Sequence, residues 1–141
     1  MANSFKVTIT TAEQQLLETD SVSLTLPGIA GYLGIWANHA PLVTALVPGV
    51  MTLKHNDSGA AGTVSHFAVS HGFVEVADNR VSVMVDSCEP SDQIDVTRAE
   101  AALERAKKLL QEPANAKVDV ARAEAALERA KARLIAAKKG K

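Results

Sequence analysis

Residues 94–110 read IDVTRAEAALERAKKLL, and the hydrophobic period of the sequence changes at this stretch. Apolar residues recur every three or four positions, as on one side of an α-helix, and either Asp95 or Thr97 suits the capping position at its start. The apolar positions are Ala99, Ala102, Leu103, Ala106, Leu109 and Leu110. The stretch therefore predicts an amphipathic helix over about residues 95–111.

The same stretch occurs again 24 residues later. Residues 118–134 read VDVARAEAALERAKARL and differ from residues 94–110 at four of 17 positions, so 13 are identical. A break at 111–115 that contains Pro113 separates the copies, so we expect an antiparallel hairpin whose second helix covers about 117–138. Two copies are fewer than the three or more that a solenoid needs. The apolar positions of the second helix are Ala123, Ala126, Leu127, Ala130 and Leu134.

Alanine dominates the apolar side of both predicted helices. Alanine lets helix axes approach closely, but it buries little area compared with leucine, whose full burial contributes roughly 1.5–3 kcal/mol. The helices themselves are rich in strong helix formers, and Glu104 and Lys108 form an i,i+4 pair. These properties suit a mobile arm, and they equally suit a static hairpin packed on the rest of the chain.

Upstream of this region, apolar residues alternate with polar ones, the period of a half-buried strand. Turn residues separate the segments at Pro27-Gly28, Pro48-Gly49, Asn56–Gly62 and Asp78-Asn79. Many short strands at this spacing indicate an antiparallel β-sandwich or barrel of about 8–10 strands over residues 1–88, with a linker at 89–93 and the helical arm at 94–141. The expected strands are 5–10, 14–18, 21–26, 42–47, 50–55, 63–69, 73–77 and 81–86.

Length and composition indicate one folded domain with an appendage. The 141 residues are 47% apolar and carry a net charge of −1, without the 18 consecutive apolar residues of a membrane-spanning helix. The N-terminus runs directly into a strand pattern rather than a leader, and the single cysteine, Cys88, excludes an internal disulfide. We expect a protein that stays in a reducing cytoplasm.

Charge is distributed unevenly along the chain. Residues 1–93 contain three basic and nine acidic side chains, a net charge of −6, whereas residues 94–141 contain twelve basic and seven acidic ones, a net charge of +5. A basic arm suits an acidic partner surface, although a solvated helical face rich in Lys and Arg has the same composition.

The sequence offers little for catalysis. It lacks a phosphate-binding loop of the form GxxxxGK[ST], a GxSxG elbow and an HExxH zinc motif. His66 and His71 are five residues apart on an extended segment, so they face opposite sides and predict no shared metal site. Cys88 suits a small packed thiol.

A central segment carries a family resemblance. Residues 34–49 read GIWANHAPLVTALVPG, which resembles the signature GILPxHAPLxTxLxPG of the ATP synthase epsilon family. The resemblance continues at 12–15, 72–76 and 80–86 and at the helix start 94–99, so it covers nearly the whole chain in family order. Trp36 and Ala37 depart from the usual Leu-Pro. The indole of Trp36 suits a hydrophobic anchor, and it equally suits a partly buried residue at the end of the sandwich.

The resemblance implies a rotor subunit without catalytic residues of its own. The sandwich would bind the gamma subunit, through Ile35, Trp36, His39 and Leu42, and would sit against the ring of c subunits. The arm would lie folded on the sandwich or extend into the catalytic head of alpha and beta subunits and hinder ATP hydrolysis. The resemblance also implies a peripheral position on the cytoplasmic face of the bacterial inner membrane.

The resemblance also implies a partner for the basic residues of the arm. In the family the extended arm meets an acidic segment of the beta subunit, and such an attraction weakens with salt. The residues that the resemblance assigns to this contact are Arg122, Arg129, Lys131 and Arg133, with Lys138 and Lys139 nearby.

A regulatory ATP site is a further implication. Some bacterial members hold ATP in the folded state through the motif I/L-D-x-x-R-A, and residues 94–99 match it. Arginine pairs with phosphate bidentately, and a carboxylate accepts from an amine or ribose hydroxyl. The motif is also an ordinary helix start with a capping Asp, so both readings stay open. The expected ligand residues are Glu89, Ile94, Asp95, Arg98, Ala99 and Arg105, with Arg122 and Arg129 from the second copy. No other cofactor and no metal is expected.

Two other functions compete with the rotor role. A free-standing nucleotide sensor would bind ATP tightly and would form no stable complex with gamma. A helical adaptor would pair with a partner helix, but the alanine-rich seam lacks sustained leucine heptads. Nucleic-acid binding is disfavoured because the basic tail has no aromatic residue for stacking and carries seven acidic ones.

Overall fold

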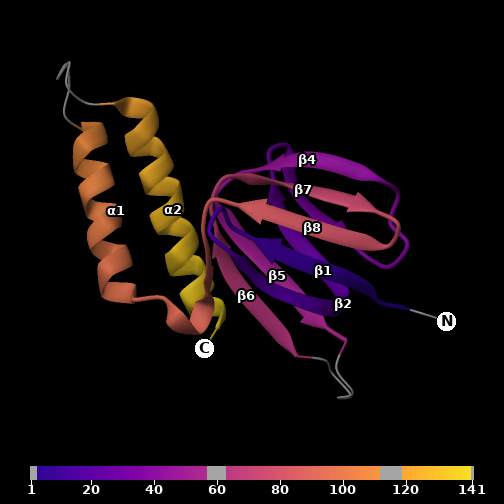
Figure 1. The fold of residues 1–141 in the computed structure, drawn as a ribbon. Helices are drawn as coiled ribbons and strands as arrows, with labels where there is room; N and C mark the ends of the chain where they lie inside the picture. Colours follow the sequence, from indigo (N-terminus) through magenta and orange to yellow (C-terminus); the bar gives the residue numbers. More distant parts are fainter. Residues whose placement is uncertain (1–2, 57–62, 112–118, 141) are drawn as a thin grey trace.

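A β-sandwich and a helical hairpin make up the molecule, with the hairpin against one side of the sandwich (Figure 1). The computed structural model describes residues 3–56, 63–111 and 119–140. The predicted fold class is confirmed, including the number of strands. The strands are β1 (Phe5–Thr10), β2 (Gln15–Gly28), β3 (Gly31–Ile35), β4 (Leu42–Leu46), β5 (Gly49–His55), β6 (Val64–Val69), β7 (Gly72–Ala77), β8 (Arg80–Val85) and β9 (Cys88–Pro90). The short 3-10 helix η1 (Ser91–Gln93) leads to α1 (Val96–Gln111) and α2 (Val120–Lys139).

The sheet is mixed rather than purely antiparallel. Its order is β1-β8-β7-β4-β2-β5-β6-β9, with β3 added on β2, and β1 also pairs with β2 so that the sheet folds over on itself. All described pairs are antiparallel except β1 with β8, in which Val7 lies opposite Val81. The expectation of a fully antiparallel sandwich is therefore corrected. The pairing of β1 with β2 sets the direction of β1, and β8 runs the same way beside it.

Strand β2 combines two segments that the sequence separates. Residues 14–18 and 21–26 were expected as two strands, but one strand runs from Gln15 to Gly28 and serves both layers. Its pairing register to β5 shifts between Ser21 and Ser23, which marks a β-bulge. The bulge turns Ser21 inward, where it is 0% exposed, although the alternation places it on the polar side. Ser21 Oγ lies 2.8 Å from the carbonyl oxygen of Ser23 and 2.7 Å from that of Lys54.

Turn predictions succeed at one place and fail at another. Asp78 and Asn79 both have positive φ, 53° and 59°, and connect β7 to β8 as the expected two-residue hairpin turn. Pro27-Gly28 was expected to end a strand before a loop, but both residues belong to β2 and pair with β3. A Cβ at Gly28 would lie 2.8 Å from the carbonyl oxygen of Gly31, so glycine permits this close approach. Positions 57–62 and 112–115 of the predicted breaks lie outside the described residues.

Two separate hydrophobic clusters hold the molecule together. The main cluster lies inside the sandwich and contains only strand residues, among them Val7, Leu53 and Val83, each 0% exposed. The second cluster is small: Ala136 of α2 packs on Val50 and Ala68, with Ile94 against them. Helix α2 lies between α1 and the strands β5 and β6 (Figure 1). The arm therefore rests on the outer face of the sandwich, and the small cluster that the two parts share is separate from the main cluster.

Candidate functional site

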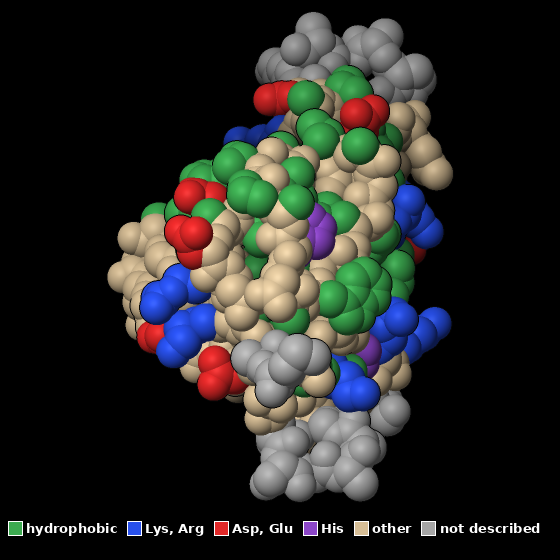
Figure 2. Space-filling view, turned by 90° about the vertical axis from the view of Figure 1, so that its right-hand side faces the viewer, with side chains coloured by type: hydrophobic (Ala, Val, Ile, Leu, Met, Phe, Trp, Pro, Cys, Tyr) green, Lys and Arg blue, Asp and Glu red, His purple; other side chains and the backbone are tan. Residues whose placement is uncertain are grey.

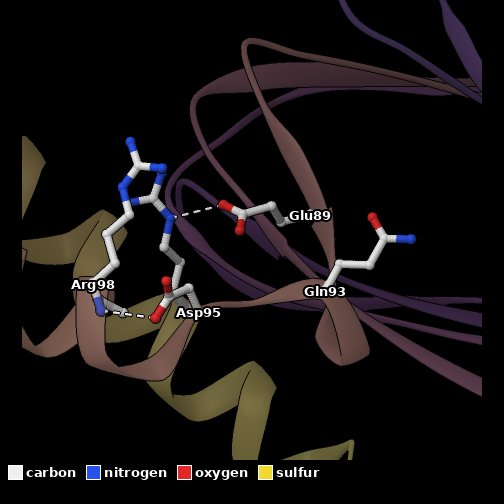
Figure 3. Close-up of a pocket in the computed structure, with 6 residues that line it drawn as sticks. Glu89, Gln93, Asp95 and Arg98 are labelled. Carbon is white, nitrogen blue, oxygen red and sulfur yellow. Dashed lines mark hydrogen bonds and ion pairs between the residues drawn. The ribbon is translucent and has the colours of Figure 1, made fainter.

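A pocket of about 320 Å³ lies where the sandwich passes into the arm, and we call it the arm-root pocket. Strand β9, helix η1, the start of α1 and the last turns of α2 all contribute to it (Figure 3). Segments that are distant in the sequence therefore meet here. The lining residues are Glu89, Gln93, Asp95, Arg98, Ala99 and Arg133.

Asp95 caps helix α1 at the edge of this pocket. Its Oδ1 accepts a hydrogen bond from the backbone N–H of Arg98 at 3.1 Å, and its carbonyl accepts from Ala99 N at 3.0 Å. Asp95, rather than Thr97, is thus the capping residue. Asp119 caps α2 in the same way, with Arg122 N at 3.1 Å from its Oδ1. The repeated motif produces two equivalent helix starts, so capping accounts for the aspartate in both copies.

An ion pair crosses the arm-root pocket. Arg133 Nε of α2 donates to Glu89 Oε1 of β9 at 2.9 Å, and the two side chains are 33% and 38% exposed. The guanidinium of Arg98 makes no hydrogen bond or ion pair with any described residue. Two arginines and two carboxylates therefore share the pocket, and one of the arginines is available to an added anion. An entering anion would compete with Glu89 for the other.

Four of the predicted ATP residues meet in the pocket, namely Glu89, Asp95, Arg98 and Ala99. Ile94 does not line it, because its side chain packs in the small cluster with Val50 and Ala68. Arg105 is exposed on α1 outside the lining.

The two arginines of α2 that the sequence assigns to the ATP site lie outside the arm-root pocket. Arg122 lies in the first turn of α2, and the antiparallel hairpin puts that turn at the opposite end from the first turn of α1, which carries Arg98 (Figure 1). Arg129 also lies outside the lining, and Arg133 contributes the cation from α2 instead. Arg122 and Arg129 therefore do not line the arm-root pocket, and their predicted part in ATP binding stays a prediction. One signal in the sequence marks Arg133: it replaces Leu109 of the first copy.

The signature segment 34–49 forms one end of the sandwich. Ile35 is 0% exposed in the main cluster, so its side chain belongs to the interior and is not available for the predicted gamma contact. Trp36 is 63% exposed, and a Cβ at Gly34 would meet its ring at 2.8 Å, so the indole lies over the Gly34 backbone. His39 and Leu42 are half-buried, and Leu42 packs against the main cluster.

Further apolar side chains are exposed on the sandwich, and the sequence reasoning did not assign them. Tyr32 is 61% exposed, Val43 69% and Phe73 45%. Cross-strand pairing brings Ala45, Phe73 and Met84 into one row over β4, β7 and β8. Figure 2 shows hydrophobic side chains exposed on the face that looks away from the helices. The available signal was an apolar residue at a polar position of an alternating strand, as at Val43 and Phe73.

Basic residues at the end of α2 lie against the sandwich rather than free of it. A groove beside β6 is lined by His66, Ser91, Asp92 and Lys139, among others. Burial, and then the charge of Lys139, lower the pKa of His66 from its usual 6.5. Lys131 pairs with Glu128 at 3.5 Å on the exposed side of α2. In the docked arm, Arg133 and Lys139 therefore lie against β9, η1 and β6 rather than in free solvent.

Neither a metal centre nor a reactive thiol emerges from the described residues. No group of three or more His, Cys, Asp and Glu side chains is arranged to hold a metal ion within residues 3–56, 63–111 and 119–140. Burial and the neighbouring Glu89 raise the pKa of the Cys88 thiol to about 12, so it stays protonated at neutral pH. In the same residues, neither helix has the length and apolar character required to span a bilayer.

Known proteins that resemble the chain agree over most of its length. Residues 4–91 match the model for the ATP synthase delta/epsilon chain β-sandwich domain, and residues 92–138 match the model for the long α-helix domain of the same chain. The ATP synthase epsilon chain of Desulfitobacterium hafniense is 41% identical over 112 residues, which cover 79% of this chain and 81% of that protein. The epsilon chain of Moorella thermoacetica is 43% identical over 109 residues, covering 77% and 78%.

Solved structures give the same result. A chain in the Euglena gracilis mitochondrial ATP synthase structure of OSCP, F1 and c-ring superimposes with a TM-score of 0.82 at 26% identity, covering 98% of this chain and 83% of that one. A chain in the Tetrahymena thermophila mitochondrial central stalk and c-ring has the same fold, with a TM-score of 0.60 at 17% identity, covering 96% and 94%. The two domain matches and the relatives above 40% identity together show that the chain belongs to the delta/epsilon family of ATP synthase subunits.

Proposed function

We propose that the chain is a non-catalytic rotor subunit of a proton-translocating ATP synthase, in which the sandwich joins the central stalk and the arm regulates ATP hydrolysis. The observation that carries the proposal is the likeness over 98% of the chain to a subunit in an F1 and c-ring assembly. Its partners would be the gamma subunit, the c-ring and the alpha and beta subunits. Its place would be peripheral, on the cytoplasmic face of the bacterial inner membrane.

Exposed apolar side chains on the sandwich support a protein partner. Trp36 and Val43 expose 63% and 69% of their surface, and a protein partner would remove these apolar side chains from water. Aromatic side chains are also the residues that most often dominate the binding energy of protein interfaces. We assign Trp36, together with His39 and Leu42 of the same segment, to the contact with gamma.

Co-purification with gamma tests this assignment. The wild-type chain, mixed with the gamma subunit of the same synthase, should elute with it in size-exclusion chromatography. Trp36→Ala should weaken the complex by about 1–2 kcal/mol or more if the indole is a hot spot. Leu109→Ala removes an apolar side chain that is 43% exposed on the arm and serves as the control. Equal affinity of the Trp36 variant and wild type would remove Trp36 from the interface, and absence of any complex would overturn the rotor role.

Regulation by the arm rests on the way in which it is attached. The arm contacts the sandwich through the small cluster, the groove beside β6 and one partly exposed ion pair. Every described residue buried in α2 is alanine, so detaching the arm exposes little apolar surface. Once detached, the arm would present Arg122, Arg129, Lys131 and Arg133 to an acidic surface of the beta subunit. Deleting residues 94–141 should then relieve inhibition of ATP hydrolysis in the reconstituted synthase, and unchanged inhibition would contradict this role.

ATP sensing is a second proposal, and the arm-root pocket supports it. Arg98 has an uncommitted guanidinium, Arg133 contributes a second cation, and the Glu89 and Asp95 carboxylates can accept from an amine or hydroxyl. A ligand that bridges β9, α1 and α2 would hold the arm in its docked position. ATP would therefore act as a ligand of the folded arm, with no chemistry performed on it.

A thermal-shift titration tests the ATP proposal. Ligand at 100 times its Kd should stabilise the native chain by about 2.7 kcal/mol, which raises the melting temperature. Arg98→Ala should abolish the increase. Arg122→Ala is the matched control, because it alters the equivalent residue of the second copy outside the pocket. A missing shift for the wild type, or equal loss in both variants, would overturn ATP binding here and leave the rotor proposal intact.

A further inference from the structure

The internal repeat gives two nearly identical helices, yet among the described residues it is α2 that packs along the sheet. Helix α2 contacts β5, β6 and η1, whereas α1 packs on α2. Equivalent positions of the two copies can therefore be compared directly, because each pair has the same helical setting but different surroundings.

Shared positions form the seam of the hairpin. Ala99 and Ala106 of α1 are each 2% exposed, and their equivalents in α2, Ala123 and Ala130, are 3% and 0% exposed. These residues recur at a spacing of seven on one side of each helix, so both copies use the same side to contact each other. The identical part of the repeat accounts for the hairpin and does not distinguish the helices.

Two of the four departures from the repeat, at positions 108/132 and 109/133, lie on the docked side of α2. Lys108 of the first copy is exposed, and its equivalent, Ala132, is only 3% exposed. Ala132 comes four residues before Ala136, which packs on Val50 and Ala68, so both alanines lie on the side of α2 that faces the sheet. The next pair is Leu109, 43% exposed on α1, and Arg133, whose Nε donates to Glu89.

We propose that Ala132 and Arg133 determine which helix of the arm docks on the sandwich. Ala132 allows the close approach of α2 to β5 and β6, and Arg133 aligns the helix through Glu89. Helix α1 carries Lys108 and Leu109 at these positions. A lysine there would hold the backbone away from the sheet by the length of its stem, and leucine offers Glu89 no donor. This inference concerns the isolated chain and does not depend on its role in the synthase.

Distances between spin labels on the sandwich and the arm test the proposal on the full chain. Labels at Glu75→Cys on β7 and Glu104→Cys on α1 occupy two exposed positions, and Cys88→Ala leaves only these two thiols. Dipolar spectroscopy should give one narrow distance for the docked arm. Ala132→Lys should remove this peak, with about a tenfold or larger fall in the docked-to-undocked ratio, because docking would require burial of a charge. Far-UV circular dichroism should show unchanged helix content, since lysine is a good helix former.

Two further variants separate the proposal from a general effect of charge. Ala101→Lys makes the same substitution at an exposed position of α1 and should leave the distance unchanged. Arg133→Leu, which copies the first repeat, should lower the docked-to-undocked ratio by roughly 2- to 5-fold, as expected for one partly exposed ion pair. A retained docked peak in Ala132→Lys, or its equal loss in Ala101→Lys, would overturn the proposal.

Discussion

The interior of the sandwich contains leucine, isoleucine, valine, methionine and phenylalanine, whereas every described residue buried in α1 and α2 is alanine. Larger side chains remove more apolar surface from water, at roughly 25 cal/mol per Å². The sandwich therefore stabilises itself, while the arm depends on helix propensity, a narrow seam and a small contact with the sheet. The chain therefore combines a sandwich that is stable through its own core with an arm whose docked position is only weakly stabilised.

The largest effect should follow from a cavity in the sandwich. Leu53→Ala removes a side chain that is 0% exposed in the main cluster, and we expect a loss of about 2–5 kcal/mol in the free energy of unfolding. Urea denaturation followed by circular dichroism measures it. Leu109→Ala, at a position 43% exposed on the arm, is the control and should change stability by less than about 0.5 kcal/mol. Comparable losses in both variants would break the comparison.

The bulge in β2 should give the next largest effect. Ser21→Ala leaves the carbonyls of Ser23 and Lys54 without their shared hydroxyl in a site that excludes water, at a cost of about 1–3 kcal/mol. The same denaturation experiment measures this loss. Ser23→Ala, two residues away and half-buried, should be nearly neutral. If Ser21→Ala proved neutral as well, the hydroxyl would not stabilise the bulge.

Removing the arm should affect the sandwich less than either of these changes does. A chain that ends at Gln93 keeps the nine described strands and the whole main cluster, and it loses the contacts that Ile94 and α2 make with β5, β6, β9 and η1. We expect cooperative unfolding with a stability reduced by about 1–2 kcal/mol, the value of one or two partly buried side chains. A non-cooperative transition would show that the sandwich needs the arm.

Acidification should have the smallest effect, and it should be confined to the arm. The pKa of His66 is lowered in the docked state by burial and by Lys139, so the undocked state binds its proton more readily. The contribution of neutral His66 to docking is complete above its usual pKa of 6.5 and is lost as the pH falls below that value. The spin-label distance, measured from pH 7.5 to about 5, should show more undocked arm at the acidic end. His66→Asn should reduce the pH response, and His71→Asn should keep it; the opposite pattern would exclude His66.

Much of the fold follows from local patterns that the structure confirms. The alternation at Phe5, Val7 and Ile9 corresponds to β1, and the Asp78-Asn79 turn lies where the sequence expects it. The merged strand β2, the inward turn of Ser21 and the parallel pairing of β1 with β8 were not predictable in this way. Each depends on which strands become neighbours, and a period of two carries no information about that.

The residues of the candidate site also fall into two groups, those predictable from local sequence and those that depend on tertiary packing. The motif at 94–99 locates Asp95 and Arg98 at a helix start, because capping is a local interaction. Selecting Arg133 rather than Arg122 or Arg129 requires the antiparallel hairpin and the docking of α2, which bring residue 133 to within 2.9 Å of residue 89. The burial of Ile35 beside an exposed Trp36 also depends on packing between layers.

The class of each half, the alanine seam, the capped helix starts and the family resemblance can be predicted from the sequence, because these features depend on residues close together in the chain or on a short motif. The choice of the helix that lies on the sandwich, of the arginine that meets Glu89 and of the apolar side chains that remain in solvent depends on packing between distant segments. Local patterns cannot make this choice, because near-identical helices have near-identical propensities. Their different positions arise from side-chain size and charge at a few contact positions, such as Ala132 against Lys108.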